Sequence, residues 1–401
     1  MQKRKMWIYA LVSMLVTICI SGFGRMSYGI LMPFMKESLT LTYQEAGMLA
    51  TSTAIGYLLM VLWVGILATR WGSKRLVVFG LFLLSTALII LFFVESFIQT
   101  LICMVILGVG TAFGYTPLVN IVVGWFPQNR GLMIGFLLSG MGLGTLITSG
   151  LIPIFNIWFG TDGWRFLWLI YGVISVGTTF IGLKLLQDPP NSVKNPKTDD
   201  QSFLHDVYLH KGVLLVALIY GLIGFAYLIP QSFLFSFILE KGVSEYLAGI
   251  IIGIGGFISI FSGPLWGAIS DRVGRKTSLR IIFGLSGFSV LIPIFWPFAL
   301  GFMISQIFWG LTLMGMLSLT QALAIEQTHQ KYAPVALGYT TIFFASGQIL
   351  GPGLGGIMIE HLDGIPAALW LCFGLFTLAF VLTTRLKTNE YEIEYKKKLG
   401  K

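Results

Sequence analysis

Residues 267–277 read GAISDRVGRKT, and residues 65–75 read GILATRWGSKR. The two stretches begin 202 positions apart (267 against 65), and each carries a glycine at its first and eighth positions. Both are short basic segments between long apolar runs. A repeat at so large an offset indicates two similar halves within one chain.

The apolar runs on either side of these stretches are long enough to cross a membrane. Hydrophobic residues make up 56% of the 401 residues and charged residues 11%, against about 25% charged residues in soluble domains. A run of about 20 apolar residues spans the hydrocarbon layer as a helix, because lipid offers no partners to backbone amides. Twelve spans are predicted, near 7–34, 44–68, 75–94, 97–125, 131–159, 164–186, 212–239, 246–270, 277–297, 299–324, 335–360 and 365–385.

The longest polar stretch divides these spans into six and six. We therefore expect an all-α polytopic membrane protein whose twelve transmembrane helices form two pseudo-symmetric six-helix bundles. The expected units are an N-terminal bundle (1–186), a cytoplasmic linker (187–211), a C-terminal bundle (212–388) and a basic tail (389–401). A weaker echo between GFGRMSY (22–28) and GLIGFAY (221–227) supports the repeat. The first span is too long for a cleaved signal peptide and lacks a small-residue cleavage site.

The distribution of basic residues predicts the orientation. With both termini and the linker in the cytoplasm, 22 of the 26 lysines and arginines lie on the cytoplasmic side. Lys36, Arg165 and Lys241 lie outside, and Arg25 is left within the membrane. The positive-inside rule then predicts a multi-pass protein of the inner (plasma) membrane with both termini cytoplasmic. The net charge of +9 reflects that face and does not indicate a nucleic-acid partner.

The repeated stretch carries a family resemblance. GAISDRVGRK resembles G-x-L-x-D-R-x-G-R-K, the cytoplasmic signature of the major facilitator superfamily of transporters, and it lies in the expected place in a six-plus-six chain. The resemblance implies alternating access by rocking of the two halves. It also implies that the motif acid caps a neighbouring helix and helps to close the cytoplasmic gate. Asp271 is that acid in the second copy, whereas Thr69 replaces it in the first.

We expect the gate motif to combine close helix approach, a tight turn and a basic cluster at the membrane surface. Its residues are Gly65, Arg70, Gly72, Lys74, Arg75, Gly267, Asp271, Arg272, Gly274, Arg275 and Lys276.

Two further stretches narrow the resemblance. GQILGPGLGG (347–356) has small residues around Pro352 and predicts close packing and a bend. Together with GFGRMSYGILMP (22–33), it resembles the YbfB/YjiJ group of bacterial facilitators. That resemblance implies no particular substrate.

Arg25 is the residue that most directly suggests chemistry. An arginine deep in a span costs about 2.5–3.5 kcal/mol on insertion scales and normally faces the bundle interior. None of the seventeen acidic residues lies deep in a span. A guanidinium without an internal carboxylate suits a bound carboxylate, which it can hold through two hydrogen bonds. The alternative is that carbonyls, tyrosine hydroxyls and water satisfy Arg25, which then only locks two helices.

Other polar residues at similar depth are candidates for the same site. They are Tyr28, Tyr57, Tyr115, Asn120, Tyr227, Gln231, Gln306 and Gln348. The resemblance implies that the first, fourth, seventh and tenth spans line the cavity.

These observations predict a secondary transporter of a small organic anion held by Arg25. An exporter of hydrophobic or drug-like compounds is the alternative, and it would favour acidic residues in the cavity. No catalytic motif, cofactor site or His/Cys metal spacing is recognisable, so an enzyme is not expected. The expected partners are the anion and the lipid bilayer, and the protein is expected to be a monomer. Coupling stays open between exchange with a counter-anion, uniport, and symport in which the proton travels with the substrate or titrates Glu326.

Overall fold

The computed structural model describes residues 2–189, 207–328 and 332–386, and these residues form helices and short connections. The tail predicted at 389–401 and most of the linker predicted at 187–211 lie outside the described residues. The elements are α1 (Gln2–Thr17), η1 (Ile18–Met26), α2 (Tyr28–Ser38), α3 (Tyr43–Trp71), α4 (Ser73–Ile90), α5 (Phe97–Trp125), η2 (Pro127–Asn129), α6 (Arg130–Phe159), η3 (Gly160–Asp162), α7 (Gly163–Leu185), α8 (Lys211–Glu240), α9 (Glu245–Val273), α10 (Arg275–Phe295), α11 (Ala299–Glu326), α12 (Ala333–His361) and α13 (Ile365–Arg385).

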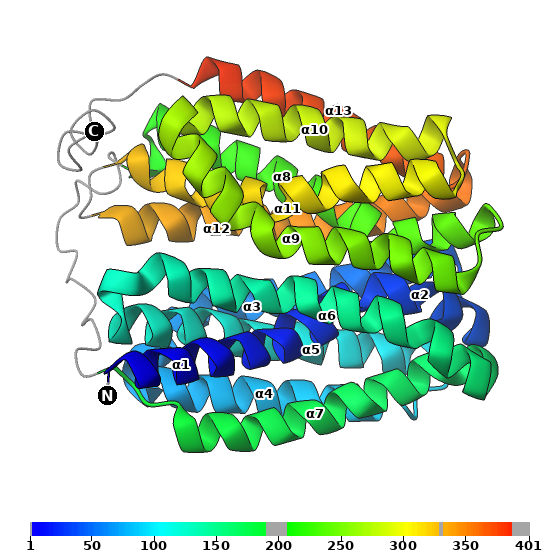
Figure 1. Ribbon diagram of the computed structural model, residues 1–401, viewed down its shortest axis with the longest axis horizontal. Helices are drawn as coiled ribbons and strands as arrows, with labels where there is room; N and C mark the ends of the chain where they lie inside the picture. Colours follow the sequence, from blue (N-terminus) through cyan, green and yellow to red (C-terminus); the bar gives the residue numbers. More distant parts are fainter. Residues whose placement is uncertain (1, 190–206, 329–331, 387–401) are drawn as a thin grey trace.

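The number of spans agrees with the prediction. Ten stretches of the described residues are long and apolar enough to cross a membrane, or eleven if the bent helix α3 is one span. One of the ten, Gly131–Leu185, contains both α6 and α7, which run in opposite directions on either side of η3 (Figure 1). Counting these two helices separately gives twelve spans.

The twelve spans form two bundles that lie side by side (Figure 1). Helices α1 to α7 make one bundle and α8 to α13 make the other. We call them the N-half and the C-half. The fold is that of a two-bundle all-α membrane protein, and the exact domain boundaries stay predictions.

The repeat is visible in the ends of the helices. Helices α3 and α9 begin at Tyr43 and Glu245 and end at Trp71 and Val273, so both ends are offset by 202 residues. The following glycines adopt almost the same backbone conformation, with φ 87° and ψ 146° at Gly72 and φ 89° and ψ 150° at Gly274. Only glycine adopts this region without strain, so the two copies of the motif make the same turn.

The same offset corrects the alignment of the first span with the seventh. Helix α2 ends at Ser38 and α8 at Glu240, again 202 residues apart. Residues 22–28 therefore correspond to 224–230, three positions beyond the stretch 221–227 that the sequence suggested. In this register Arg25 corresponds to Tyr227.

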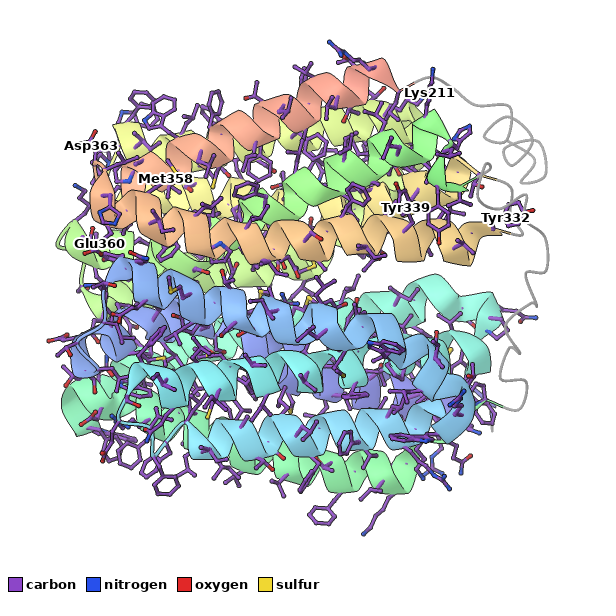
Figure 2. The ribbon with its side chains drawn as sticks, turned by 180° about the vertical axis from the view of Figure 1, so that it is seen from behind. Lys211, Tyr332, Tyr339, Met358, Glu360 and Asp363 are labelled. Atoms are coloured by element: carbon purple, nitrogen blue, oxygen red, sulfur yellow. The ribbon has the colours of Figure 1, made fainter. Side chains whose placement is uncertain are left out.

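The two halves meet along a seam formed by α2 with α8, α3 with α12, and α6 with α9. We call the end of the molecule that carries Lys211 and Tyr339 the proximal end, and the opposite end with Glu360 and Asp363 the distal end (Figure 2). Helix α1 begins at the proximal end (Figure 1).

Glycines allow the backbones to touch across the distal part of the seam. A Cβ atom at Gly29 would lie 1.8 Å from the carbonyl oxygen of Gln231, and one at Gly47 would lie 2.3 Å from that of Pro352. A Cβ at Gly249 would lie 2.2 Å from the carbonyl oxygen of Ser149. No side chain fits at these positions, so the expected close packing around Pro352 is present and extends across the halves.

Polar contacts also join the halves at the distal end. The backbone N–H of Tyr43 donates to Oε2 of Glu360 at 2.9 Å, and its hydroxyl donates to Oε1 of Glu240. Nδ2 of Asn156 donates to Oε2 of Glu245 at 2.8 Å. Three acids of the C-half thus hold groups of the N-half.

The proximal part of the seam is packed differently. A Cβ atom at Gly65, Gly267 or Gly338 would meet no atom of the described residues within 4 Å. The expectation that Gly65 and Gly267 allow close helix approach is therefore wrong for this conformation. The reason is that helix contact across the seam is made at the distal end.

We predict that Gly47→Ala destabilises the protein more than Gly65→Ala, although both residues lie on α3. The first substitution forces a methyl group onto the Pro352 carbonyl, at a cost of roughly 1–3 kcal/mol, whereas the second adds it in open space. Thermal unfolding of the purified variants in one detergent measures the difference. Equal melting temperatures would contradict the packing described for the distal seam.

Candidate functional site

Arg25 lies in η1, a π-helical segment between α1 and α2. The backbone N–H and the hydroxyl of Ser27 both donate to the carbonyl oxygen of Gly22, each at 3.0 Å, which closes the wider turn. Gly22 packs against Gly144 of α6, where a Cβ atom would lie 2.8 Å from the Gly144 Cα. Such π segments are rare and are frequent at functional sites.

The guanidinium of Arg25 reaches across the seam to the C-half. Nη2 of Arg25 donates to Oε1 of Gln348 on α12 at 3.1 Å. Nε2 of Gln348 in turn donates to the hydroxyl of Tyr227 on α8. The Cζ atom of Arg25 lies 5.2 Å from the centre of the Tyr57 ring, a distance typical of a cation–π contact. In the part of the chain that the structure describes, no carboxylate pairs with Arg25.

Four tyrosines lie in this region. Tyr57 adjoins Arg25 through its ring and Tyr227 through Gln348, while Tyr115 and Tyr220 lie close to these two tyrosines. The rings of Tyr220 and Tyr227 stack on Phe344, with centroids 4.3 and 5.6 Å away. We call Arg25, Gln348 and these four tyrosines the central cluster.

Two polar residues of this region were missed by the sequence analysis. Tyr220 belongs to the central cluster, and Nε2 of Gln321 on α11 donates to its hydroxyl at 2.7 Å. Tyr220 precedes Tyr227 by seven residues, which is two helical turns and so the same face of α8. That spacing was the signal that could have found it.

The remaining candidates lie elsewhere. The Tyr28 hydroxyl donates to the carbonyl oxygen of Ala46 at 2.6 Å, so it pins α2 to α3. Asn120 is exposed on α5 and has no described contact with the central cluster. The structure therefore brings Arg25, Tyr57, Tyr115, Tyr227 and Gln348 together and leaves these two apart.

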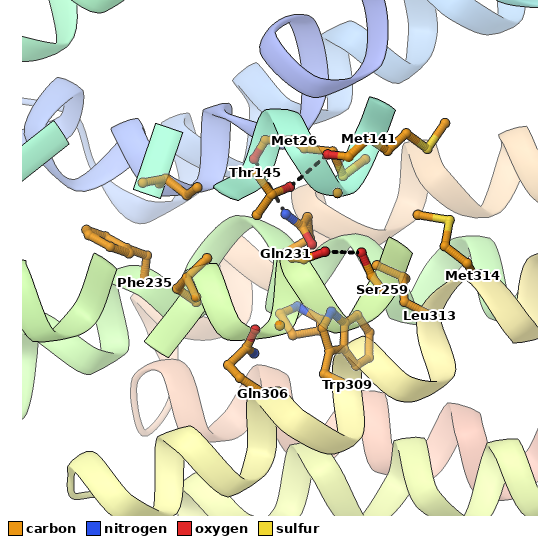
Figure 3. Close-up of a pocket in the computed structure, with 16 residues that line it drawn as sticks. Met26, Met141, Thr145, Gln231, Phe235, Ser259, Gln306, Trp309, Leu313 and Met314 are labelled. Atoms are coloured by element: carbon orange, nitrogen blue, oxygen red, sulfur yellow. Dashed lines mark hydrogen bonds between the residues drawn. The ribbon is translucent and has the colours of Figure 1, made fainter. Parts of the chain in front are cut away.

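Gln231 and Gln306 line a separate cavity between the halves (Figure 3). Its volume is only about 30 Å³, and Met26, Ser259 and Trp309 are among the lining residues. Nε2 of Gln231 donates to the carbonyl oxygen of Met26 at 3.5 Å. Since Met26 follows Arg25 directly, this cavity adjoins the central cluster on another side of η1.

The C-half copy of the gate motif forms an ion-pair network. Nε of Arg275 lies 3.2 Å from Oε1 of Glu326 on α11, and Nη2 lies 3.3 Å from Oδ1 of Asp271. Nη1 of Arg275 also donates to the Ser270 hydroxyl. Glu326 is buried, so this network anchors the α9–α10 turn to α11. These contacts stay within the C-half and do not themselves join the halves.

The N-half copy replaces the missing motif acid with a residue from another segment. The Thr69 hydroxyl donates only to the carbonyl oxygen of Ile66 in its own helix, at 2.8 Å. Oδ1 of Asp188 instead accepts from the backbone N–H of Lys74 at 2.8 Å. Asp188 lies three residues beyond the end of α7, and its negative charge is favourable at the N-terminus of α4. The start of the predicted linker is thus part of the N-half motif.

Apart from Arg275, which turns to Glu326, the basic residues of the motif are exposed or half-buried. Arg70, Arg75 and Arg272 are exposed, and Lys74 and Lys276 are half-buried. No group of three or more His, Cys, Asp or Glu side chains able to hold a metal ion occurs among the described residues.

Comparison with known proteins gives a consistent result. The family model described as Major Facilitator Superfamily matches residues 14–300 and 259–399. The chain is similar to human monocarboxylate transporter 2 (22% identity over 82% of this chain and 74% of that protein). It is also similar to the hexuronate transporter of Bacillus subtilis strain 168 (24% identity, 91% of each chain). A further relative is the agnestins efflux protein AgnL12 of Paecilomyces divaricatus (25% identity, 94% of this chain and 86% of that protein).

Solved structures show the same architecture. The D-xylose-proton symporter superimposes with a TM-score of 0.79 at 14% identity, over 96% of this chain and 98% of that one. At this identity the likeness concerns the fold alone.

We predict that Asp188→Asn lowers stability by about 1 kcal/mol, because it weakens the interaction of a carboxylate with the N-terminus of α4. Asp363→Asn, at an exposed position between α12 and α13, is the matched control. Thermal unfolding compares the two variants. The assignment fails if both substitutions shift the melting temperature equally.

Proposed function

Because the chain belongs to the major facilitator superfamily, we propose that it transports a small organic anion whose carboxylate binds to Arg25. Secondary transport of a small organic substrate follows from the family and from relatives named as monocarboxylate and hexuronate transporters. The observation that carries the anion proposal is Arg25 itself. It is a cation at the seam between the halves, and no described carboxylate pairs with it.

The surroundings of Arg25 suit a carboxylate bound to the rest of a small molecule. A guanidinium has five N–H donors in a planar fork, and the Gln348 oxygen accepts from one nitrogen of that fork. The hydroxyls of Tyr57, Tyr115, Tyr220 and Tyr227 offer further hydrogen bonds, and their rings offer apolar surface. One guanidinium balances one negative charge, so the site favours a monocarboxylate over a dicarboxylate.

The proposed mechanism is rocker-switch alternating access about the central cluster. Each of α3, α9 and α12 carries two glycines 18 residues apart, one towards each end of the helix. The pairs are Gly47 and Gly65, Gly249 and Gly267, and Gly356 and Gly338. The distal member of each pair packs on the other half, and the proximal member meets nothing within 4 Å among the described residues. This pattern supports a second state in which the proximal glycines make the contacts and the distal ones separate.

We place the proximal end in the cytoplasm of the cell and the protein in its plasma membrane, on the basis of the 22 basic residues assigned to that side. In this orientation the described conformation is closed toward the outside. The protein is proposed to act as a monomer, with protons or a counter-anion as coupling partners.

Efflux of hydrophobic or drug-like compounds is the second candidate. The relative named as an agnestins efflux protein favours it. Lipophilic cations would distinguish this candidate from anion transport, because Arg25 should repel them.

We predict that Arg25→Ala and Arg25→Lys each lose at least about thirtyfold in uptake, because each removes the bidentate partner of a buried carboxylate, worth 2 kcal/mol or more. Proteoliposomes are tested with radiolabelled lactate, glucuronate and benzoate as monocarboxylates, succinate as a dicarboxylate and tetraphenylphosphonium as a lipophilic cation. Arg385→Lys, an exposed arginine at the end of α13, is the control. Undiminished anion uptake by Arg25→Ala, or transport of the cation alone, would refute the anion proposal.

We predict that Gly267→Val leaves thermal stability unchanged but slows turnover about tenfold. Valine fits the open space at Gly267 but obstructs the closed proximal seam, and a cost of about 1.4 kcal/mol there lowers the closed population by that factor. Gly284→Val on α10, which also has open space but lies outside the seam, is the control. Equal turnover of the two variants would contradict the rocking model.

A further inference from the structure

We propose that the Gln348 amide oxygen is an internal substitute for the substrate carboxylate, which satisfies Arg25 in the empty carrier and permits net transport. This inference rests on the proposed function. It concerns the half of the cycle in which no anion is bound. Arg25 must then change surroundings without its ligand.

The hydrogen bonds determine which end of the Gln348 amide faces Arg25. A guanidinium only donates, so the atom 3.1 Å from Nη2 must be the acceptor Oε1. The amide nitrogen then points to the Tyr227 hydroxyl, which can accept from it. Both ends of the amide are used, and Gln348 is only 1% exposed. The orientation of this side chain is therefore held from both halves of the molecule.

The bond lies where substrate is expected to bind. Arg25 belongs to η1 of the N-half, and Gln348 and Tyr227 belong to α12 and α8 of the C-half. The oxygen of Gln348 occupies one of the positions in front of the guanidinium that a carboxylate oxygen would take. A ligand and Gln348 thus compete for the same donor.

The competition favours an anion when one is present. A carboxylate forms charge-assisted bonds, and its two oxygens can accept from two nitrogens of the fork. The amide group is neutral and offers only one acceptor atom. When the anion leaves, the amide oxygen restores one hydrogen bond to a cation that would otherwise be unsatisfied in a low-dielectric setting. The empty carrier can then rearrange with its charge partly satisfied.

This arrangement predicts how the carrier moves its substrate. A carrier whose empty form cannot reorient only exchanges one anion for another. A carrier whose empty form can reorient also shows net uptake of anion into vesicles that contain none. Gln348 therefore determines the ratio of net uptake to exchange, which a residue that only holds two helices together would not change.

The test measures both modes with one probe, radiolabelled lactate, in proteoliposomes of the full chain. Exchange is measured as uptake into vesicles preloaded with unlabelled lactate, and net uptake as uptake into lactate-free vesicles. Gln348→Leu removes the acceptor and retains the volume. Gln348→Glu places a permanent carboxylate on Arg25. Thr51→Val is the matched control, because the Thr51 hydroxyl makes another bond across the seam, to the Ile349 carbonyl at 3.0 Å.

We expect Gln348→Leu to lower the ratio of net uptake to exchange about tenfold, since a hydrogen bond to a charged group is lost only in the empty carrier. Gln348→Glu is expected to lose both modes while its melting temperature is retained. Thr51→Val is expected to leave the ratio of the two modes unchanged.

Three results would overturn the inference. They are a loss of both modes in equal proportion in Gln348→Leu, unchanged net uptake in that variant, and exchange without net uptake in the wild type. Absence of both modes in the wild type is a different result: with lactate, glucuronate and benzoate alike, it would reject the proposed function.

Discussion

A positive charge within a membrane-spanning bundle must be satisfied by the protein or by a ligand, because lipid offers it nothing. In this chain the hydrogen bond from Arg25 to Gln348 meets that requirement and at the same time joins the two halves at their centre. The π turn that Ser27 closes on Gly22, the ring of Tyr57 and the amide of Gln348 all adjoin this one guanidinium. The central cluster is therefore organised around a charge that a neutral amide satisfies only in part.

Much of the fold could be predicted from the sequence because its signals are local. Apolar runs and turn glycines act within a few residues, and a comparison of two short stretches reveals the repeat, which the matching conformations of Gly72 and Gly274 confirm. Arg25 could be singled out in the same way, because a charge in an apolar run needs no partner in order to be noticed. Its actual partner lies 323 residues away, and no local pattern identifies that contact.

The points that the sequence did not predict depend on the conformation or on side-chain direction. Gly65 has the residue type and spacing of a packing glycine, yet it meets nothing, because contact across the seam is made at the other end of the helix. Tyr28 lies three residues from Arg25, but its hydroxyl turns to Ala46. Thr69 appeared to leave the N-half without its acid, and Asp188, more than a hundred residues later, supplies a carboxylate to the same turn. Each case depends on how separate helices pack against one another, which no single stretch of sequence shows.

The repeat also has a consequence for any molecule bound at the centre. Two identical halves would present the same groups from both sides, and an unsymmetrical ligand could then lie in either of two equivalent poses. Here the corresponding positions hold Arg25 and Tyr227, and Gln348 bonds to both, its oxygen to the arginine and its nitrogen to the tyrosine. The two halves are thus nearly symmetric, and the difference between Arg25 and Tyr227 makes the site between them asymmetric. A carboxylate would have one preferred direction, pointing to the N-half, and its opposite end would face the tyrosine rings of the C-half.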